Sequence, residues 1–120
     1  MKTIISPSKA AEYFESKLDF TTGPVELQQM MKNNEVRVID VRAPEDFAQG
    51  HIPGAVNLPK TKWLTLAGLA HEKVNVVYCY TQACHLAAKA CKFFADNDYP
   101  VMELEGGFEG WSHYKMPIEK

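Results

Sequence analysis

The sequence predicts an α/β protein with a mostly parallel sheet, because strands of the buried type alternate with helical segments along the chain. Residues 36–41 (VRVIDV) and 74–80 (VNVVYCY) are rich in β-branched residues and nearly apolar on both faces, which is typical of central parallel strands. After the second strand, apolar residues return at the helical period over residues 83–97. The 120 residues suffice for one domain with a single hydrophobic core.

Two helices are expected before the first of these strands. Residues 8–18 predict a short helix with Ser8 as its N-cap. Pro24 suits the first position of a second helix over residues 24–34. After the first strand, two glycines and two prolines in residues 50–59 (GHIPGAVNLP) predict an irregular turn that leads into a short strand.

The second half of the chain continues the alternation. Residues 63–70 are a helix candidate, and the strand 74–80 follows them. The next helix, over 83–97, has an apolar stripe at positions 84, 87, 88, 91, 94 and 95. Residues 99–107 (YPVMELEGG) predict a third strand, and residues 108–114 (FEGWSHY) predict a last short helix.

Composition narrows the class of function. The formal net charge of −2 gives no reason to expect nucleic acid or an anionic membrane as a partner. No apolar run is long enough to cross a bilayer, and residues 1–17 lack the apolar core of a signal peptide. Three cysteines are too few for a secreted disulfide scaffold. A cytoplasmic location is therefore the expectation.

Two cysteines lie close together in the stretch 79–90 (CYTQACHLAAKA), where a strand ends and a helix begins. Ligand sites of α/β sheets form outside the carboxyl ends of the strands. There, the N–H groups of the loop 80–84 and of the helix N-terminus can converge on Cys79 and stabilise negative charge. We therefore expect the pKa of Cys79 to be lowered toward physiological pH. This position predicts Cys79, rather than Cys84, as a nucleophile.

Four short motifs occur in order along the chain: VIDVR (38–42) with Glu45 and Phe47, GHIPGAVNLP (50–59), VVYC (76–79) and LEGGFEGW (104–111). Over roughly residues 18–118 the chain resembles the single-domain, rhodanese-like sulfurtransferases. The resemblance implies a central, mostly parallel five-stranded sheet with helices on both faces. It also implies a rhodanese-like domain over residues 18–120, preceded by an N-terminal helical extension over residues 1–17.

By this resemblance, Cys79 accepts sulfane sulfur as a persulfide and passes it to a nucleophile, without a metal or an organic cofactor. The family's sulfurtransferase loops have six residues counting the cysteine, and here these are Cys79, Tyr80, Thr81, Gln82, Ala83 and Cys84. The loop N–H groups would hold the persulfide anion. The implied partners are a small sulfur donor (thiosulfate, or a thiol persulfide or polysulfide) and an acceptor, which is a thiol, protein thiols included, or a cyanide-like molecule.

The loop departs from the family's usual pattern in charge and in one glycine. Gln82 stands where glycine is common, and none of the residues from Tyr80 to Ala83 carries the cation that often attracts thiosulfate. His85, at the start of the helix, could offer partial positive charge at about pH 6 to 7. We therefore hypothesise that thiosulfate is a poor donor and that a thiol persulfide or polysulfide is preferred.

Other functions are weighed against sulfur transfer. A related phosphatase or arsenate reductase is disfavoured, because its loop has one residue more and ends in an arginine that clamps an oxyanion, whereas His85 follows this loop. A non-catalytic or redox-sensing module that uses a Cys79–Cys84 thiol pair is the alternative to catalysis. Cys84 either packs inward or acts as a second thiol that attacks the persulfide or closes a disulfide. Both a monomer and a homodimer are open.

The remaining candidates are assigned mainly to structure. Cys91 lies on the apolar stripe of its helix and is expected in the core. A zinc site is disfavoured, because the spacing of the three cysteines and His85 fits no common ligand pair. Asp40 is expected to be part of the scaffold, and Arg42 either lines the rim of the site or is structural. The resemblance gives His51 a structural role, fixing its turn through side-chain hydrogen bonds.

Overall fold

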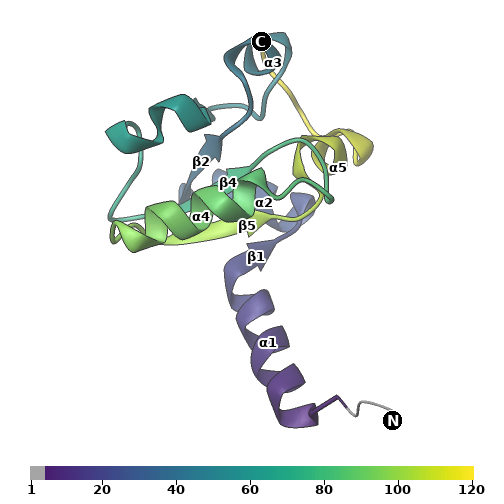
Figure 1. The fold of residues 1–120 in the computed structure, drawn as a ribbon. Helices are drawn as coiled ribbons and strands as arrows, with labels where there is room; N and C mark the ends of the chain where they lie inside the picture. Colours follow the sequence, from purple (N-terminus) through teal and green to yellow (C-terminus); the bar gives the residue numbers. More distant parts are fainter. Residues whose placement is uncertain (1–4) are drawn as a thin grey trace.

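The computed structural model describes residues 5–120, which contain one sheet of five parallel strands (Figure 1). The strands follow the order β1-β5-β4-β2-β3 across the sheet. Their bounds are β1 (Thr21–Thr22), β2 (Val36–Asp40), β3 (Val56–Asn57), β4 (Val74–Tyr78) and β5 (Val101–Leu104). The predicted α/β class with a parallel sheet is confirmed. The strand that precedes Cys79 is the central one.

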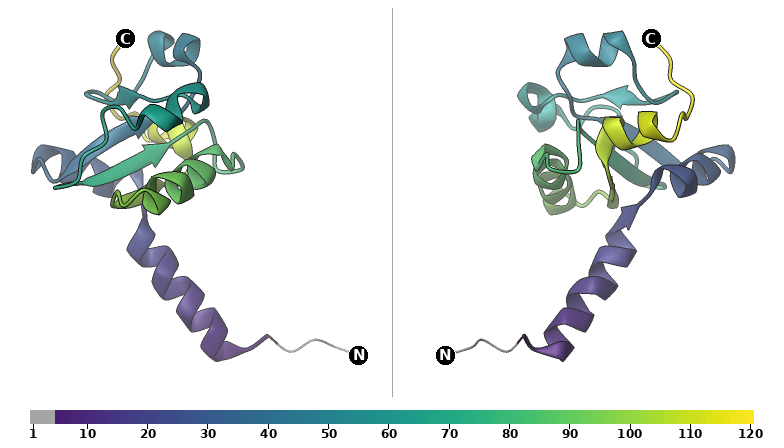
Figure 2. Two further views of the ribbon diagram at one scale, coloured as in Figure 1. Left: turned by 60° about the vertical axis from the view of Figure 1, so that its left-hand side comes forward. Right: turned by 90° about the vertical axis from the view of Figure 1, so that its right-hand side faces the viewer.

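Helices cover both faces of the sheet. The helices of the described residues are α1 (Pro7–Phe20), which extends away from the sheet (Figure 2), α2 (Pro24–Lys32), α3 (Pro44–Gln49), a 3-10 helix η1 (Lys60–Thr65), α4 (Leu86–Asp96) and α5 (Gly107–His113). Each face of the central strand has its own core. Val77 and Cys79 pack toward α4 in one cluster, whereas Val76 and Tyr78 pack on the opposite face in the cluster that holds Trp111 of α5. Alternation along the strand therefore sends Cys79 to the α4 side.

The first helix, α1, extends away from the sheet, as both views of Figure 2 show. It begins one residue after Ser6, whose side chain accepts a hydrogen bond from the N–H of Lys9 at 3.3 Å, so the prediction of Ser8 as the N-cap is wrong. None of the α1 residues is buried. Lys17 pairs with Glu105 at 2.9 Å where the helix meets the sheet. Residues 1–4 of the predicted extension lie outside the described residues.

Several predicted bounds differ from the structure for physical reasons. The helix predicted over 63–70 is instead the 3-10 helix η1, which stops where Leu66 adopts a left-handed conformation. The helix predicted from residue 83 begins only at Leu86, so Cys84 lies in the loop. The buried residues of this helix are Ala87, Ala90 and Phe94. The short elements β1 and α3 were not predicted, because two to six residues are too few to show a period. No helix within residues 5–120 is both long and apolar enough to cross a membrane.

Candidate active site

Cys79 directly follows the central strand β4, and its side chain is buried on the α4 side of the sheet. Only 2% of the residue is exposed. A turn in the loop, in which the N–H of Cys84 donates to the carbonyl oxygen of Thr81 at 3.2 Å, folds the chain back over Cys79. As a result, the Sγ atom of Cys79 lies 3.6 Å from the carbonyl oxygen of Cys84.

The Cys79 thiol donates a hydrogen bond to the backbone carbonyl oxygen of Cys84, and each thiol shifts the pKa of the other. Burial, with a further contribution from the neighbouring Cys84 thiol, raises the pKa of Cys79 to about 12 against the opposing effect of the Ala87 and Tyr80 N–H groups. For Cys84, partial burial would raise the pKa, but the hydrogen bond from Cys79 and nearby backbone N–H groups lower it. The prediction of a lowered pKa for Cys79 is therefore wrong, because the more buried sulfur keeps its proton while Cys84 ionises first.

The loop rests on the segment that joins β5 to α5. The N–H of Phe108 donates to the carbonyl oxygen of Cys79 at 2.9 Å, and the N–H of Glu109 donates to that of Tyr80 at 2.9 Å. The backbones approach so closely at Gly107 (φ 60°) that a Cβ there would lie 2.8 Å from the carbonyl carbon of Tyr80. Sequence reasoning missed this supporting role, although the paired glycines of LEGGFEGW were a usable signal.

The remaining loop residues lie at the surface or partly buried. Gln82 is exposed, and its side-chain oxygen accepts a hydrogen bond from the N–H of Gly106. None of the loop residues has a positive φ, so glutamine in place of glycine is compatible with the backbone here. Ala83 is also exposed, and Thr81 is partly buried. His85 is exposed and occupies the N-cap of α4.

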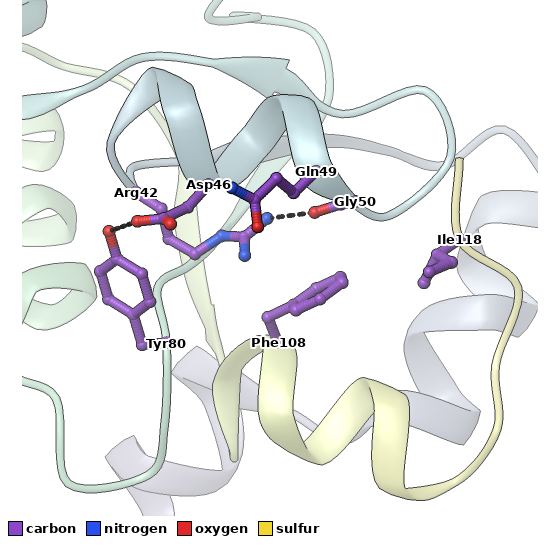
Figure 3. A pocket seen from close by; sticks show the side chains of 7 residues that line it. All are labelled: Arg42, Asp46, Gln49, Gly50, Tyr80, Phe108 and Ile118. Atoms are coloured by element: carbon purple, nitrogen blue, oxygen red, sulfur yellow. Dashed lines mark hydrogen bonds between the residues drawn. The ribbon is translucent and has the colours of Figure 1, made fainter. Parts of the chain in front are cut away.

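Tyr80 separates two cavities at the carboxyl end of the sheet. Its hydroxyl donates to Asp46 at 2.6 Å and accepts from the N–H of Ala43 at 3.1 Å, which fixes the ring against α3. The first cavity, of about 260 Å³, is shown in Figure 3 with Arg42 and Phe108 facing each other across it. The Arg42 guanidinium lies 4.2 Å from the centre of the Phe108 ring. Arg42 thus both lines a cavity beside the loop and is almost entirely buried.

The second cavity, of about 320 Å³, opens on the other side of Tyr80. Its walls are mostly apolar, and Val41 and Leu86 belong to the same core cluster as Cys79. Lys60, an exposed residue at the start of η1, is its cationic lining residue. Sequence reasoning did not identify Lys60, because this residue is distant from the loop in the sequence. Only the folded structure places it in the lining of this cavity.

Asp40 and Arg42 form a buried ion pair beneath these cavities. The Arg42 side chain donates to both carboxylate oxygens of Asp40, at 2.8 to 3.2 Å, and to the carbonyl oxygen of Gly50 at 2.6 Å. The hydroxyl of Tyr78 donates to Asp40 at 2.6 Å and accepts from the N–H of Ile52 at 3.1 Å. Burial raises the pKa of Tyr78, with Asp40 adding to the effect, so the phenol stays protonated. This network ties β2 and β4 to the turn 50–52.

His51 holds the same turn from the other side. Its Nδ1 donates to the carbonyl oxygen of Phe47 at 2.8 Å, and the two rings stack 3.7 Å apart. Its Nε2 lies 3.3 Å from a carboxylate oxygen of Glu119, and the backbones of these two residues exchange hydrogen bonds at 2.9 Å. His51 lies outside both cavities beside Tyr80. Within residues 5–120, no group of three or more His, Cys, Asp or Glu side chains is placed to hold a metal ion.

Comparisons with known proteins add independent information. A family model described as "Rhodanese-like domain" matches residues 23–114. The thiosulfate sulfurtransferase GlpE of Stutzerimonas stutzeri is 32% identical over 84% of this chain and 94% of its own length. The HTH-type transcriptional regulator Rv0324 of Mycobacterium tuberculosis is also 32% identical over 92% of this chain, which spans 49% of that regulator. The solved structure of BH2092 from Bacillus halodurans has a TM-score of 0.84 at 34% identity, over 95% of this chain and 86% of that chain.

Proposed function

The chain belongs to the rhodanese-like domain family, and we propose that it is a sulfurtransferase that carries sulfane sulfur on Cys79. The similarity to sulfurtransferases over most of their length supports sulfur transfer in general. The observation that carries the assignment to Cys79 is its position: the sulfur lies at the end of the central strand, beside the N–H groups of Tyr80 and Ala87. Such donors stabilise a sulfur anion.

The reaction proceeds in two displacements. The Cys79 thiolate attacks the outer sulfur of a donor R–S–SH, so that a new S–S bond forms on Cys79 while the donor's S–S bond breaks and the thiolate R–S⁻ leaves and takes up a proton. A nucleophilic acceptor then removes the outer sulfur and restores the Cys79 thiolate. No electrons are gained or lost overall, and no cofactor is needed.

Ionisation of Cys79 depends on its neighbour. The neighbouring Cys84 has the lower pKa of the two thiols and ionises first. Transfer of the Cys79 proton to the Cys84 thiolate then leaves the thiolate on Cys79, where the donor is attacked. The pair therefore becomes reactive at the pH at which it loses its first proton, although the pKa of Cys79 alone is raised.

The cavity lined by Lys60 favours an organic persulfide over thiosulfate as the donor. Its Val41 and Leu86 walls suit the carbon chain of a small thiol, and the single Lys60 ammonium suits a carboxylate at the far end of such a molecule. The loop from Tyr80 to Ala83 has no cation beside the sulfur, where the doubly charged thiosulfate would need one. We therefore assign thiol persulfides as the preferred donor class.

Intact-mass measurement tests this function. The wild type and Cys79→Ser are incubated with thiosulfate and, separately, with glutathione persulfide, and Cys91→Ser is the matched cysteine control. For a persulfide on Cys79 we expect the wild type and Cys91→Ser to gain about 32 Da early in the incubation. Cys79→Ser should show no such gain. Equal loading of wild type and Cys79→Ser would refute the assignment, and faster loading from thiosulfate would refute the donor class.

The thiol pair favours a second candidate function. A rhodanese-like module whose Cys79 and Cys84 only oxidise and reduce would sense redox state without transferring sulfur. Turnover separates the two functions, because a sensor reacts once whereas a sulfurtransferase releases many equivalents of sulfur to an acceptor. Oxyanion chemistry of the phosphatase type has less support, because the chain's only arginines, Arg37 and Arg42, lie outside the loop.

A further inference from the structure

We propose that Cys84 is a resolving thiol that attacks the Cys79 persulfide, closes a Cys79–Cys84 disulfide and releases hydrogen sulfide. The inference rests on the proposed function, since it needs a persulfide on Cys79, and it adds a second activity: the reduction of thiol persulfides to thiol and sulfide. The observation that carries it is the position of the Cys79 sulfur 3.6 Å from the carbonyl oxygen of Cys84, inside one short loop that holds both thiols.

The geometry brings the two thiols together before any donor arrives. The loop turn at Thr81 folds Cys84 back toward Cys79, and the Cys79 thiol donates a hydrogen bond to the carbonyl oxygen of Cys84 at 3.6 Å. Both cysteines belong to the loop between β4 and α4, so closing a disulfide between them is a rearrangement within this loop. Cys91, by contrast, lies within α4, and its thiol donates to the carbonyl oxygen of Met102 at 3.7 Å.

Exposure and ionisation give the two thiols different roles. Cys79 is buried, whereas Cys84 is partly exposed. The backbone N–H groups that lower the pKa of Cys84 belong to Leu86, Tyr80 and Ala87. Once Cys79 carries the persulfide, Cys84 is the remaining thiol of the loop, and its partial exposure and the neighbouring N–H groups favour its thiolate, which is the attacking form.

The chemical step balances without an external oxidant. The Cys84 thiolate attacks the inner sulfur of Cys79–S–SH, a bond forms between the two Sγ atoms, and the outer sulfur leaves as HS⁻ with the electron pair of the broken S–S bond. The persulfide sulfur is reduced to sulfide, and the two cysteine thiols are oxidised to the disulfide. A dithiol reductant of the thioredoxin class must then reduce that disulfide before the next cycle.

A single-turnover experiment under anaerobic conditions tests the proposal. Reduced wild type, Cys84→Ser and Cys91→Ser each receive one equivalent of glutathione persulfide, excess small molecules are removed, and intact mass and released sulfide are followed without reductant. We expect the wild type and Cys91→Ser to pass from a gain of about 32 Da to a loss of about 2 Da as one sulfide per chain appears. Cys84→Ser should keep the added sulfur at least roughly ten times longer.

Tryptic peptides identify the bond that forms. Residues 74–89 form one peptide that contains both Cys79 and Cys84, whereas Cys91 falls in the next one, residues 90–92. An internal disulfide in the first peptide supports the proposal, and a cross-link between the two peptides overturns it.

The outcomes separate this inference from the function on which it rests. A wild type that gains the sulfur and keeps it as long as Cys84→Ser leaves sulfur transfer intact and overturns the resolving role. If neither the wild type nor Cys84→Ser gains sulfur or releases sulfide, the sulfurtransferase function itself is refuted. Because Cys84 is only partly buried, serine fits its site, and a thermal unfolding midpoint matched to the wild type checks the variant's fold.

Discussion

The backbone N–H of Phe108 donates a hydrogen bond to the carbonyl oxygen of Cys79 at 2.9 Å, so the proposed nucleophile is held in place by the first turn of α5. The contact joins two segments that lie far apart in the sequence. It exists only because Gly107 lets the two backbones approach within a distance that any side chain would prevent. The position of the nucleophile is therefore set by a glycine outside its own loop.

Gly107→Ala is expected to displace the loop. The added Cβ would lie 2.8 Å from the carbonyl carbon of Tyr80, and the φ of 60° is strained for alanine, at a cost of about 1 to 3 kcal/mol. Persulfide loading of Cys79 should fall by roughly tenfold to a hundredfold, because the sulfur and its N–H donors lose their alignment. Single-turnover loading and urea unfolding measure the two effects.

Gly54→Ala is the matched control for backbone strain. Gly54 has a comparable φ of 78°, but a Cβ added there would meet nothing within 4 Å. This variant should lose stability through the strained φ while loading Cys79 at the wild-type rate. If Gly54→Ala and Gly107→Ala slow loading equally, the effect is general destabilisation and the loop contact is not responsible.

The sequence contains the information for the scaffold in local patterns. The apolar runs around Val38 and Val76 predict buried parallel strands, and the strand-to-helix order places Cys79 at the carboxyl end of one of them. The contacts that surround Cys79 are different in kind. Gly107 lies against the loop and Lys60 lines a cavity beside it, although both belong to elements that are distant along the chain. The spacing of apolar residues within one element does not show which elements become neighbours.

The pKa of Cys79 illustrates why the electrostatics of the site could not be predicted. A helix N-terminus is visible in the sequence and lowers a thiol pKa, whereas the depth of burial depends on how the loop folds over the sulfur. In the structure, burial outweighs the N–H groups at Cys79, while at the more exposed Cys84 the hydrogen bonds outweigh burial. The site is a pair of thiols rather than one activated cysteine.

Asp40→Ala is expected to lower the free energy of unfolding by about 3 to 5 kcal/mol, because it leaves the buried Arg42 guanidinium without its carboxylate partner. The Tyr78 hydroxyl loses its acceptor in the same variant. Asp96→Ala is the control, since it removes an exposed pair with Lys92 that contributes little. Urea unfolding compares the two variants. A small loss in Asp40→Ala would mean that water or a shift of Arg42 satisfies the buried charge.

Lys60→Ala is expected to raise the KM for glutathione persulfide by roughly threefold to tenfold with little change in kcat, because in the proposed binding mode Lys60 contacts the donor away from the reacting sulfur. Lys62→Ala is the control, an exposed lysine in the same helix η1 that does not line the cavity. Steady-state kinetics with a thiol acceptor measure both. The effect should shrink at high salt, and equal changes in the two variants would point to overall charge rather than to this cavity.

Loading of the wild type is expected to speed up with rising pH and to level off above the first pKa of the thiol pair, which lies below the ordinary thiol value of 9.0. The sign follows from the thiolate being the attacking form, so that activity is present above this pKa and is lost as pH falls through it. Cys84→Ser lacks the thiol with the lower pKa, so only the buried Cys79, whose pKa burial raises, ionises, and the midpoint should move upward by about one unit or more. Glutathione release in single turnovers gives both profiles, with Cys91→Ser expected to follow the wild type. Identical midpoints in wild type and Cys84→Ser would show that Cys79 ionises without its neighbour.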